Sequence, residues 1–445
     1  MALKALDIYK LLPKKNCKEC GDPTCLTFAM KLAGGKGDVE KCPYLSEEAK
    51  RVLGASTRPP IQRVKIGVGE RNITVGEEFV FFRHEKTFYH PPGLMFRVSD
   101  TWPAERIKTV TRRVRDEQLV RIGTVLRFDG IAVRSESGEA GAFRKAVAAV
   151  EEEADLPEVL IAENPSVQEA GLAECGNFRP LIHAATRNNY EAMCRLAVKY
   201  GCPLCVKGDT PADLAELAGL CSSAGVQRLV LDLSSGTLRD FITASTAVRQ
   251  SAICRTTPGL GYPVYYDTTL AGMQDACLAL GILKFGSVLV TDPLSAASAK
   301  AALTLRQNIY TDPQKPIQMN PGLYPVGTPG QDAPVLLTVN FSLTYFTLQG
   351  YLEASKITCY LLIVDTEGLS VLTAVAAGKL NETLVKESLE KFGVAGLVAH
   401  RRLIIPGYAA PLSGRIEETT GWKVLVGPRD AAGIGEFLEK EWRSG

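Results

Sequence analysis

The stretch EVLIAENPSVQEAGLAECGNFRPLIHAAT, residues 158–186, decides the fold of most of this chain. Its two ends, EVLIAE and LIHAAT, are short apolar runs of the kind found in parallel strands that are buried on both faces. The residues between them have the apolar spacing of a helix. A strand, a helix and a second strand in this order form a βαβ unit, so this stretch predicts an α/β fold with a parallel sheet.

The same unit recurs throughout residues 92–312. Eight short apolar runs follow one another there, with a helical stretch between successive runs. Eight units over this length favour a closed (β/α)8 TIM barrel, and a doubly wound open sheet with extra strands is the alternative. The eight runs are LMFRVSD (94–100), IAVRS (131–135), EVLIAE (158–163), LIHAAT (181–186), PLCVKG (203–208), RLVLDL (228–233), PVYYD (263–267) and SVLVTD (287–292).

A second, shorter series of strand-like runs follows a loop-rich stretch. It predicts a compact doubly wound domain of the Rossmann or flavodoxin-like type over residues 325–445. The runs are APVLLTVN (333–340), CYLLIVD (359–365), RRLIIPG (401–407) and WKVLVG (422–427), and helical stretches separate them.

The chain before the barrel divides into two parts. Residues 1–57 hold a cluster of cysteines and end in ASTRPP (55–60), whose consecutive prolines oppose a helix and predict a linker. Residues 58–91 contain RVKIGVG (63–69) and EFVFFRHEKTFYH (78–90), which predict β-hairpin structure that connects the first domain to the barrel.

Composition excludes several classes of function. The 51 basic residues nearly balance the 49 acidic ones, so charge does not point to nucleic acid or to a membrane surface. No apolar run approaches the roughly 20 residues that span a bilayer, and the first residues do not have the pattern of a signal peptide. We therefore expect a cytoplasmic protein, in which the twelve cysteines stay reduced.

Four of the cysteines form a metal-binding pattern. Cys17, Cys20, Cys25 and Cys42 have the spacing C-x2-C-x4-C-x16-C. Three thiols on a tight loop and a fourth that returns after a short helix can surround an iron–sulfur cluster, which Cys₄ ligation suits. A zinc site is the alternative, although zinc sites usually contain two close cysteine pairs and this pattern has one. We predict a 4Fe-4S cluster, ahead of zinc and of a two-iron cluster.

The block CKECGDPTCLTFAMKLAGGK, with the later KCPYL, resembles the N-terminal domain of the large (gamma) subunit of the corrinoid iron–sulfur protein family, which serves the reductive acetyl-CoA (Wood–Ljungdahl) pathway. The resemblance covers essentially the whole chain, in the same order of domains. It continues through FRHEKTFYH (82–90), RQNIYTDPQKPI (306–317), TVNFSLTYF (338–346), VDTEGLSVLTA (364–374) and VGPRDAAGI (426–434).

This resemblance implies a methyl carrier rather than a stand-alone enzyme. In the family, a corrinoid on the C-terminal domain accepts a methyl group on cobalt(I) from methyltetrahydrofolate through a methyltransferase. The group then passes from methylcobalt(III) to the nickel cluster of acetyl-CoA synthase, and the 4Fe-4S cluster reductively reactivates cobalt(II). The implied partners are a small subunit that completes a heterodimer, the methyltransferase, acetyl-CoA synthase/CO dehydrogenase and a low-potential electron donor such as ferredoxin.

The corrinoid contacts are expected where the C-terminal strands end, because ligands of open parallel sheets bind beyond the carboxyl ends of the strands. The resemblance implies that Thr373 is the side chain nearest the lower face of the cobalt. These residues are also typical of ordinary turns and helix caps, which is the alternative interpretation. The expected contacts are Asn340, Ser342, Thr344, Thr347, Gly368, Leu369, Ser370, Leu372, Thr373, Gly407, Tyr408, Gly427, Arg429, Ala432 and Gly433.

A histidine ligand below the cobalt is not expected. The domain contains no D-x-H-x-x-G sequence, and its one histidine, His400, precedes an apolar run without the aspartate and glycine of that motif.

The barrel raises a competing hypothesis. Acidic residues end several of its predicted strands, where barrel enzymes place catalytic groups, although such residues also cap helices. We favour a scaffold. The alternative function is an iron–sulfur redox enzyme with a barrel active site and a C-terminal flavin or nucleotide domain, but no G-x-G-x-x-G follows a C-terminal strand. The acidic residues are Asp100, Glu163, Asp232, Asp267 and Asp292.

Overall fold

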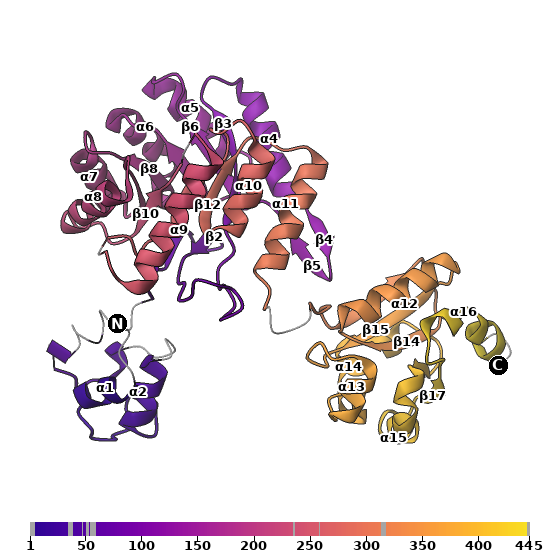
Figure 1. Cartoon of the computed structure of the whole chain (residues 1–445). Helices are drawn as coiled ribbons and strands as arrows, with labels where there is room; N and C mark the ends of the chain where they lie inside the picture. The colour runs from indigo at the N-terminus through magenta and orange to yellow at the C-terminus, as the bar shows by residue number, and fades with distance from the viewer. Residues whose placement is uncertain are drawn as a thin grey trace. The chain divides into compact units, whose positions relative to one another are not determined.

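The computed structural model of the chain describes residues 5–33, 39–46, 48–49, 53, 59–234, 236–257, 259–312 and 317–442 (Figure 1). Its contacts form two compact units, one of residues 1–119 with 127–310 and the other of residues 120–126 with 311–445. Residues 55–58 of the predicted linker lie outside the described residues, and the predicted domain boundaries stay a prediction. No helix in the described ranges has the length and apolarity needed to cross a membrane.

The N-terminal residues build a small apolar core of their own. Helix α1 spans Ala5–Leu11, α2 spans Cys25–Ala33, and a 3-10 turn, η1, spans Val39–Lys41. Ile8 of α1 and Phe28 and Leu32 of α2 are almost completely buried in one cluster, which also holds Cys25 and Cys42. The cysteines therefore sit on a packed scaffold and not on a free loop.

The central strands close into a barrel of eight parallel strands, so the predicted TIM barrel is confirmed. Strand β12 pairs with β3 from Val288↔Gly93 to Thr291↔Phe96, which joins the last strand to the first. The strands are β3 (Gly93–Ser99), β6 (Gly130–Arg134), β7 (Glu158–Ile161), β8 (Leu181–Ala185), β9 (Leu204–Lys207), β10 (Leu229–Asp232), β11 (Val264–Asp267) and β12 (Gly286–Thr291). The helices around them are α4 (Ala104–Asp116), α5 (Ala140–Glu151), α6 (Pro165–Cys175), α7 (Tyr190–Tyr200), α8 (Pro211–Ser223), α9 (Leu238–Cys254), α10 (Gln274–Leu283) and α11 (Ala296–Ile309).

A β-hairpin covers the amino end of the barrel. Strand β1 (Val64–Val68) pairs with β2 (Arg71–Val75), and its buried Ile66 belongs to the same apolar cluster as Met95 and Val159 inside the barrel. The amide of Gly67 donates to the carbonyl of Arg179, just before β8 begins. The hairpin is therefore the floor of the barrel, where the sequence predicted a connector.

The prediction of strand structure at residues 78–90 is wrong. The sequence favoured residues 78–90 as strand structure, but those residues form only an isolated bridge, between Glu78 and Ile61. The partner of β1 is β2, because a turn at Gly69, whose φ is +57°, reverses the chain at once. The apolar residues of 78–90 pack instead of pairing: the ring of Phe81 meets that of Phe285 edge-on at 5.2 Å.

The C-terminal unit is an open five-stranded sheet in the order β13-β15-β14-β16-β17. The four parallel strands match the four predicted runs. The antiparallel edge strand β13 was not predicted, because its Pro325 argues against a strand anywhere except at a sheet edge. The strands are β13 (Gly322–Val326), β14 (Val335–Val339), β15 (Cys359–Val364), β16 (Arg402–Ile405) and β17 (Lys423–Val426).

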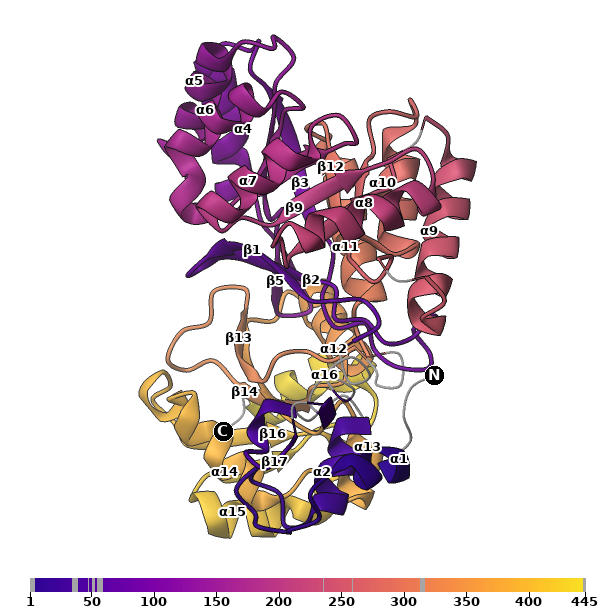
Figure 2. The ribbon, with the colours of Figure 1, turned by 90° about the vertical axis from the view of Figure 1, so that its left-hand side faces the viewer.

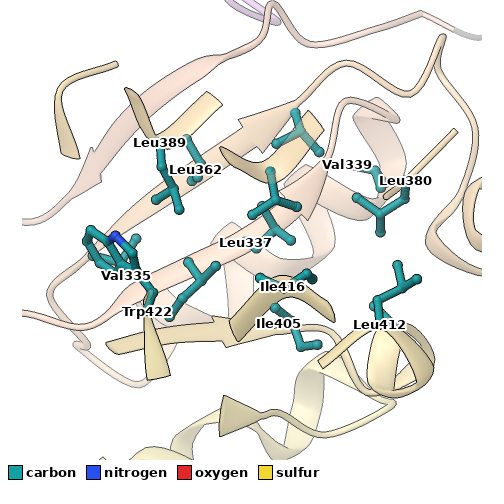
Figure 3. Packing of buried hydrophobic residues seen from close by; sticks show 14 of the residues in the cluster. Val335, Leu337, Val339, Leu362, Leu380, Leu389, Ile405, Leu412, Ile416 and Trp422 are labelled. Atoms are coloured by element: carbon teal, nitrogen blue, oxygen red, sulfur yellow. The ribbon is translucent and has the colours of Figure 1, made fainter. Parts of the chain in front are cut away.

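Helices cover both faces of this sheet. Side chains of β14 alternate between the faces, as the pleat of a strand requires: Val335, Leu337 and Val339 enter one core, shown in Figure 3, and Leu336 enters the other. The first core also takes residues of α13 (Val371–Ala376), α14 (Glu382–Lys391) and α15 (Ser413–Thr420), and the second takes residues of α12 (Ser342–Ala354) and α16 (Ile434–Phe437). Figure 2 shows α12 and α16 on one side of the sheet and α14 and α15 on the other.

A short hairpin from the barrel sequence belongs to the C-terminal unit. Strands β4 (Leu119–Arg121) and β5 (Thr124–Leu126) lie in the connection between α4 and β6, and residues 120–126 cluster with residues 311–445. Ile122 is 6% exposed and packs in the core that holds Met319 and Leu336. The side-chain amide of Asn320 donates to the carbonyl of Gly123 at 2.7 Å. The C-terminal unit is therefore not one continuous segment.

Candidate functional site

The four N-terminal cysteines lie in the small N-terminal domain, where Cys25 and Cys42 belong to the apolar cluster and Cys20 packs against it. Cys17 and Cys20 are half-buried on the loop before α2, Cys25 is the first residue of α2, and Cys42 follows η1. Burial raises the pKa of the Cys42 thiol, a hydrogen bond with the Tyr44 backbone lowers it, and the sulfurs of Cys20, Cys17 and Cys25 raise it further. Cys254 is the exposed cysteine elsewhere in the described chain.

The loop around these cysteines turns in a way that suits an anionic cluster. Lys14, Asn16 and Lys18 have φ of +57°, +49° and +65°, and alternating left-handed residues turn backbone N–H groups inward, as in the nests that surround many iron–sulfur sites. The amide of Asn16 donates to the sulfur of Cys25 at 3.4 Å, and its side-chain oxygen accepts from the Cys25 amide at 2.7 Å. Four thiols with an amide donor to sulfur fit an iron–sulfur cluster.

A pocket of about 470 Å³ lies at the carboxyl end of the C-terminal sheet. It is bordered by β14, β16, α12, α13 and the turn η5 (Ala431–Gly433) that follows β17. Its volume falls within the usual range for small-molecule sites. The predicted residues that line it are Thr344, Thr347, Ser370, Leu372, Tyr408, Gly427 and Arg429.

The pocket opens where the strand order reverses. From β14 the chain continues to β15 on one side, and from β15 it crosses back to β16 on the other side. Strand β14 pairs with β15 from Val335↔Tyr360 to Val339↔Val364, but with β16 only at Leu336↔Ile404. The two strands therefore separate beyond that pair, and this is the switch point at which open α/β sheets bind ligands.

Asn340 organises the neighbouring loop and does not line the pocket. Its side-chain oxygen accepts hydrogen bonds from the amides of Thr366 and Gly368, both at 3.0 Å, and its amide donates to Asp365 at 2.9 Å. Gly368 takes a φ of +76°, which suits glycine. Because Asn340 is buried and its bonding capacity is used within the protein, it positions the loop that ends at Ser370, from which α13 with Leu372 begins.

The other predicted residues outside the lining lie beside it. Gly407 allows two loops to meet, since a Cβ there would come within 2.8 Å of the Arg429 nitrogen and of the Gly427 oxygen. The hydroxyl of Thr373 is exposed and 3.0 Å from that of Ser370. The residues that are adjacent to the lining but do not form it are Ser342, Gly368, Leu369, Thr373, Gly407, Ala432 and Gly433.

Apolar side chains surround the mouth of the pocket and remain exposed. Leu343 is 64% exposed, Leu372 59% and Tyr408 43%, and the Arg429 guanidinium lies 5.8 Å from the Tyr408 ring. Exposed apolar groups gathered at one site mark a binding surface. Leu343 and Leu348 were missed, although they flank the predicted Thr344 and Thr347 on one face of α12. Helical spacing would have found them.

Comparisons with known proteins agree with the family resemblance seen in the sequence. A family model described as "CO dehydrogenase/acetyl-CoA synthase delta subunit" matches residues 63–438, and a model for an Fe-S cluster matches residues 12–44. The "Corrinoid/iron-sulfur protein large subunit" of Moorella thermoacetica is 41% identical, over 98% of each chain. This chain belongs to the corrinoid/iron–sulfur protein large-subunit family.

A further relative and a solved structure were also found. The "Acetyl-CoA decarbonylase/synthase complex subunit gamma" of Methanopyrus kandleri is 38% identical, over 99% of this chain and 98% of its own. A dihydropteroate synthase structure from Xanthomonas albilineans covers 57% of this chain and 100% of its own at 15% identity, with a TM-score of 0.40, too low to support an argument.

The acidic residues at the barrel strand ends are paired with other protein groups. Asp232 lies 2.9 Å from the His183 ring, Lys207 donates to Glu163 at 2.8 Å, and Asp100 accepts from two serine hydroxyls. The hydrogen bond from Lys207 lowers the pKa of Glu163. The remaining pairs are Arg134 with Asp267 and Arg97 with Asp292. These pairs support the scaffold interpretation of the barrel.

His400 lies at the amino end of the C-terminal sheet, away from the pocket. Its Nε2 is 2.9 Å from the carbonyl oxygen of Ala333, and its Nδ1 accepts from the amide of Arg402 at 3.2 Å. Its ring meets that of Trp442 edge-on. Both ring nitrogens therefore form hydrogen bonds with backbone groups, one just before β14 and one at the start of β16.

Proposed function

We propose that this chain is a methyl carrier that holds a 4Fe-4S cluster on Cys17, Cys20, Cys25 and Cys42 and a corrinoid at the carboxyl edge of its C-terminal sheet. Iron–sulfur and corrinoid are the cofactors of its family. The observation that carries the proposal is the pocket at the switch point between β14 and β16, in a chain whose N-terminal domain packs Cys20, Cys25 and Cys42 in or against one apolar cluster.

The proposed role joins two reactions of one-carbon metabolism. A bound corrinoid supplies a cobalt centre that can carry a methyl group. The group would come from methyltetrahydrofolate through a methyltransferase and leave for the nickel cluster of acetyl-CoA synthase. The iron–sulfur cluster would supply the electron that returns oxidised cobalt to its reactive state. The apolar floor and rim of the pocket hold the cofactor in place for both transfers.

Each part of the site has its own task in this proposal. Apolar residues of the rim, such as Leu343 and Leu372, support the flat macrocycle and exclude water beneath it. Ser370 lies at the end of the loop that Asn340 fixes and Thr373 lies in the first turn of α13, and we propose that their hydroxyls face the lower side of the macrocycle. His400 is bonded to the backbone at the other end of the sheet, so we propose that no histidine binds the cobalt.

The proposed partners follow the names of the relatives. Relatives carry the name of an acetyl-CoA decarbonylase/synthase complex, which supports assembly of this chain with acetyl-CoA synthase/CO dehydrogenase. We further propose a small subunit that completes a heterodimer, a methyltetrahydrofolate-dependent methyltransferase, a ferredoxin-like electron donor and a cytoplasmic location.

Metal content tests the proposal directly. The chain, coexpressed with its small subunit and purified without oxygen, is expected to contain about four iron atoms and one cobalt atom, with the absorption of both cofactors. Cys42→Ser should lower iron and leave cobalt unchanged, and Cys254→Ser, at an exposed cysteine outside the cluster, should change neither. Zinc in place of iron together with no cobalt would overturn the proposal.

A further inference from the structure

Two hydrogen bonds join Asn16 to Cys25 in opposite directions. The backbone N–H of Asn16 donates to the Sγ of Cys25 at 3.4 Å, and the backbone N–H of Cys25 donates to the Oδ1 of Asn16 at 2.7 Å. The two bonds close the loop of residues 16–25, which also contains Cys17 and Cys20. They therefore fix both ends of the segment that carries three of the four predicted cluster ligands.

Asparagine suits position 16 for two reasons. The backbone there is left-handed, with a φ of +49°, and asparagine adopts this conformation more readily than most residues that have a Cβ. Its side chain also accepts from the N–H of Cys25, the first residue of α2, which has no acceptor within the helix. The side chain thus holds the start of α2 against the loop.

Helix capping alone does not account for the bond to sulfur. The hydroxyl oxygen of Thr24 already accepts from the N–H of Thr27 at 3.1 Å, as an N-cap residue does. A neutral thiol is a weak hydrogen-bond acceptor, whereas an anionic sulfur accepts a much stronger, charge-assisted bond. The N–H of Asn16 is therefore placed where it matters most once Cys25 is a thiolate ligand.

Hydrogen bonds to the ligand sulfurs are one of the factors that set the reduction potential of an iron–sulfur cluster. Reduction adds one electron, part of whose charge resides on the sulfurs. An N–H donor then stabilises the reduced cluster more than the oxidised one. The bond from Asn16 should accordingly raise the reduction potential.

We propose that Asn16 is a positioning residue of the 4Fe-4S cluster: its side chain fixes the Cys25 amide, so that its own N–H bonds to the Cys25 thiolate and raises the reduction potential of the cluster. This proposal rests on the proposed function and deepens it. Asn16 binds no iron itself. It determines how readily the cluster accepts one electron from the ferredoxin-like donor.

The test measures the reduction potential in three proteins. Each full chain is coexpressed with its small subunit in cells grown without cobalt, so that no corrinoid signal overlaps, and is titrated anaerobically with EPR detection of the reduced cluster. Asn16→Gly keeps the left-handed backbone and the N–H but removes the side-chain oxygen. Lys14→Gly is the matched control, because Lys14 is also left-handed and exposed on the same loop. A salt concentration of about 1 M screens the charge that this control loses.

The expected result is a lower potential in one variant. Asn16→Gly should retain iron but reduce the equilibrium constant for reduction about tenfold, the usual value of one hydrogen bond to a charged group. For a one-electron couple this is a fall of about 59 mV. Lys14→Gly should change the constant less than about twofold, since its charge is screened.

A pulsed-EPR measurement detects the bond itself. In the parent protein labelled with nitrogen-15 only at asparagine, the reduced cluster should show a nitrogen-15 coupling, because an N–H bonded to a ligand sulfur receives spin density from the cluster. The coupling should be absent in Asn16→Gly, whose residue 16 carries no label. That difference assigns the coupling to position 16, which a purely structural role would not produce.

Three outcomes would overturn the inference while leaving the proposed function intact. These are a parent potential in iron-loaded Asn16→Gly, an equal shift in Lys14→Gly, or no asparagine coupling in the parent. If Asn16→Gly does not retain iron, the coupling in the parent decides alone. A parent chain without iron would overturn the proposed function itself, so iron content distinguishes the two failures.

Discussion

The barrel and the C-terminal sheet differ in the residues that follow their parallel strands. In the barrel, the strand-end acids Glu163, Asp232 and Asp292 are each paired with a basic group of another strand. In the C-terminal sheet, apolar residues at the strand ends stay exposed and a pocket opens between β14 and β16. A closed sheet has no switch point, and its interior is filled by side chains, whereas an open sheet that reverses its strand order leaves a crevice.

The largest effect is expected from breaking a buried pair in the barrel. Asp232 and His183 are 4% and 6% exposed. Burial alone would raise the pKa of Asp232, but hydrogen bonds from His183 and Ser234 hold it below its usual value. Asp232→Ala should lower the free energy of unfolding by about 3 kcal/mol, because it leaves His183 buried without its partner. The thermal midpoint should fall by roughly 10 °C.

Thermal denaturation followed by circular dichroism checks this prediction. Asp209→Ala, at an exposed acid in the loop after β9, is the control and should change the midpoint little. Corrinoid binding at low temperature should be unaffected in both variants. If Asp232→Ala kept its stability but lost a catalytic activity of the parent protein, the barrel mouth would be an active site. That result would contradict the interpretation of the barrel as a scaffold.

A smaller effect is expected at the close approach below the pocket. Gly407→Ala would place a Cβ within 2.8 Å of three backbone atoms of residues 427–429, so these loops must move. We expect a loss of about 1–3 kcal/mol in stability of the C-terminal unit and a weaker affinity for corrinoid. Gly414→Ala is the matched control, since nothing lies within 4 Å of its new Cβ. Equal corrinoid affinities in titrations of the two variants would contradict a role for Gly407.

The smallest expected effect is a change in how the stability of the barrel depends on pH. Burial raises the pKa of Glu158 well above its usual value, the charge of Glu151 raises it further, and Arg71, which both carboxylates share, lowers it. The folded barrel thus holds a proton that the unfolded chain releases above the ordinary glutamate pKa. Its stability should fall as the pH rises from that value through the raised one.

Glu158→Gln should remove this dependence. The difference in unfolding free energy between about pH 5 and pH 7 should shrink by about 1 kcal/mol relative to the parent, measured by urea denaturation. The described residues of the C-terminal unit bury only neutral polar side chains, namely Thr338, Asn340, Thr366 and Ser388. We therefore expect the unfolding free energy of that unit to depend less on pH. An equal pH dependence in both units would contradict the difference proposed between the two sheets.

Much of the fold could be predicted because parallel strands buried on both faces are visible as continuous apolar runs. The eight barrel strands and four strands of the C-terminal sheet were found in this way. Strand β13 was not predicted because it contains a proline, which argues against a strand. Strand β2 was not predicted because polar and apolar residues alternate only weakly in RNITV, which follows a tight turn. The pairing of residues 120–126 with the C-terminal unit depends on contacts far apart in sequence, which no local pattern reveals.

The site was predictable in position but not in detail. Strand ends were expected to hold the ligand, and seven expected residues line the pocket, from Thr344 to Arg429. The sequence does not show that the side chain of Asn340 forms its hydrogen bonds with residues 365–368, nor that Leu343 remains exposed. Both facts depend on how α12 packs on the sheet. Each corrinoid contact stays a prediction.

The hairpin at residues 120–126 has a consequence for the C-terminal unit when it is expressed alone. A gene fragment that begins at residue 311 would encode the C-terminal sheet without Ile122, and the apolar cluster around Met319 would lose one of its members. Residues 311–445 alone are therefore expected to be less stable than the same residues together with the hairpin.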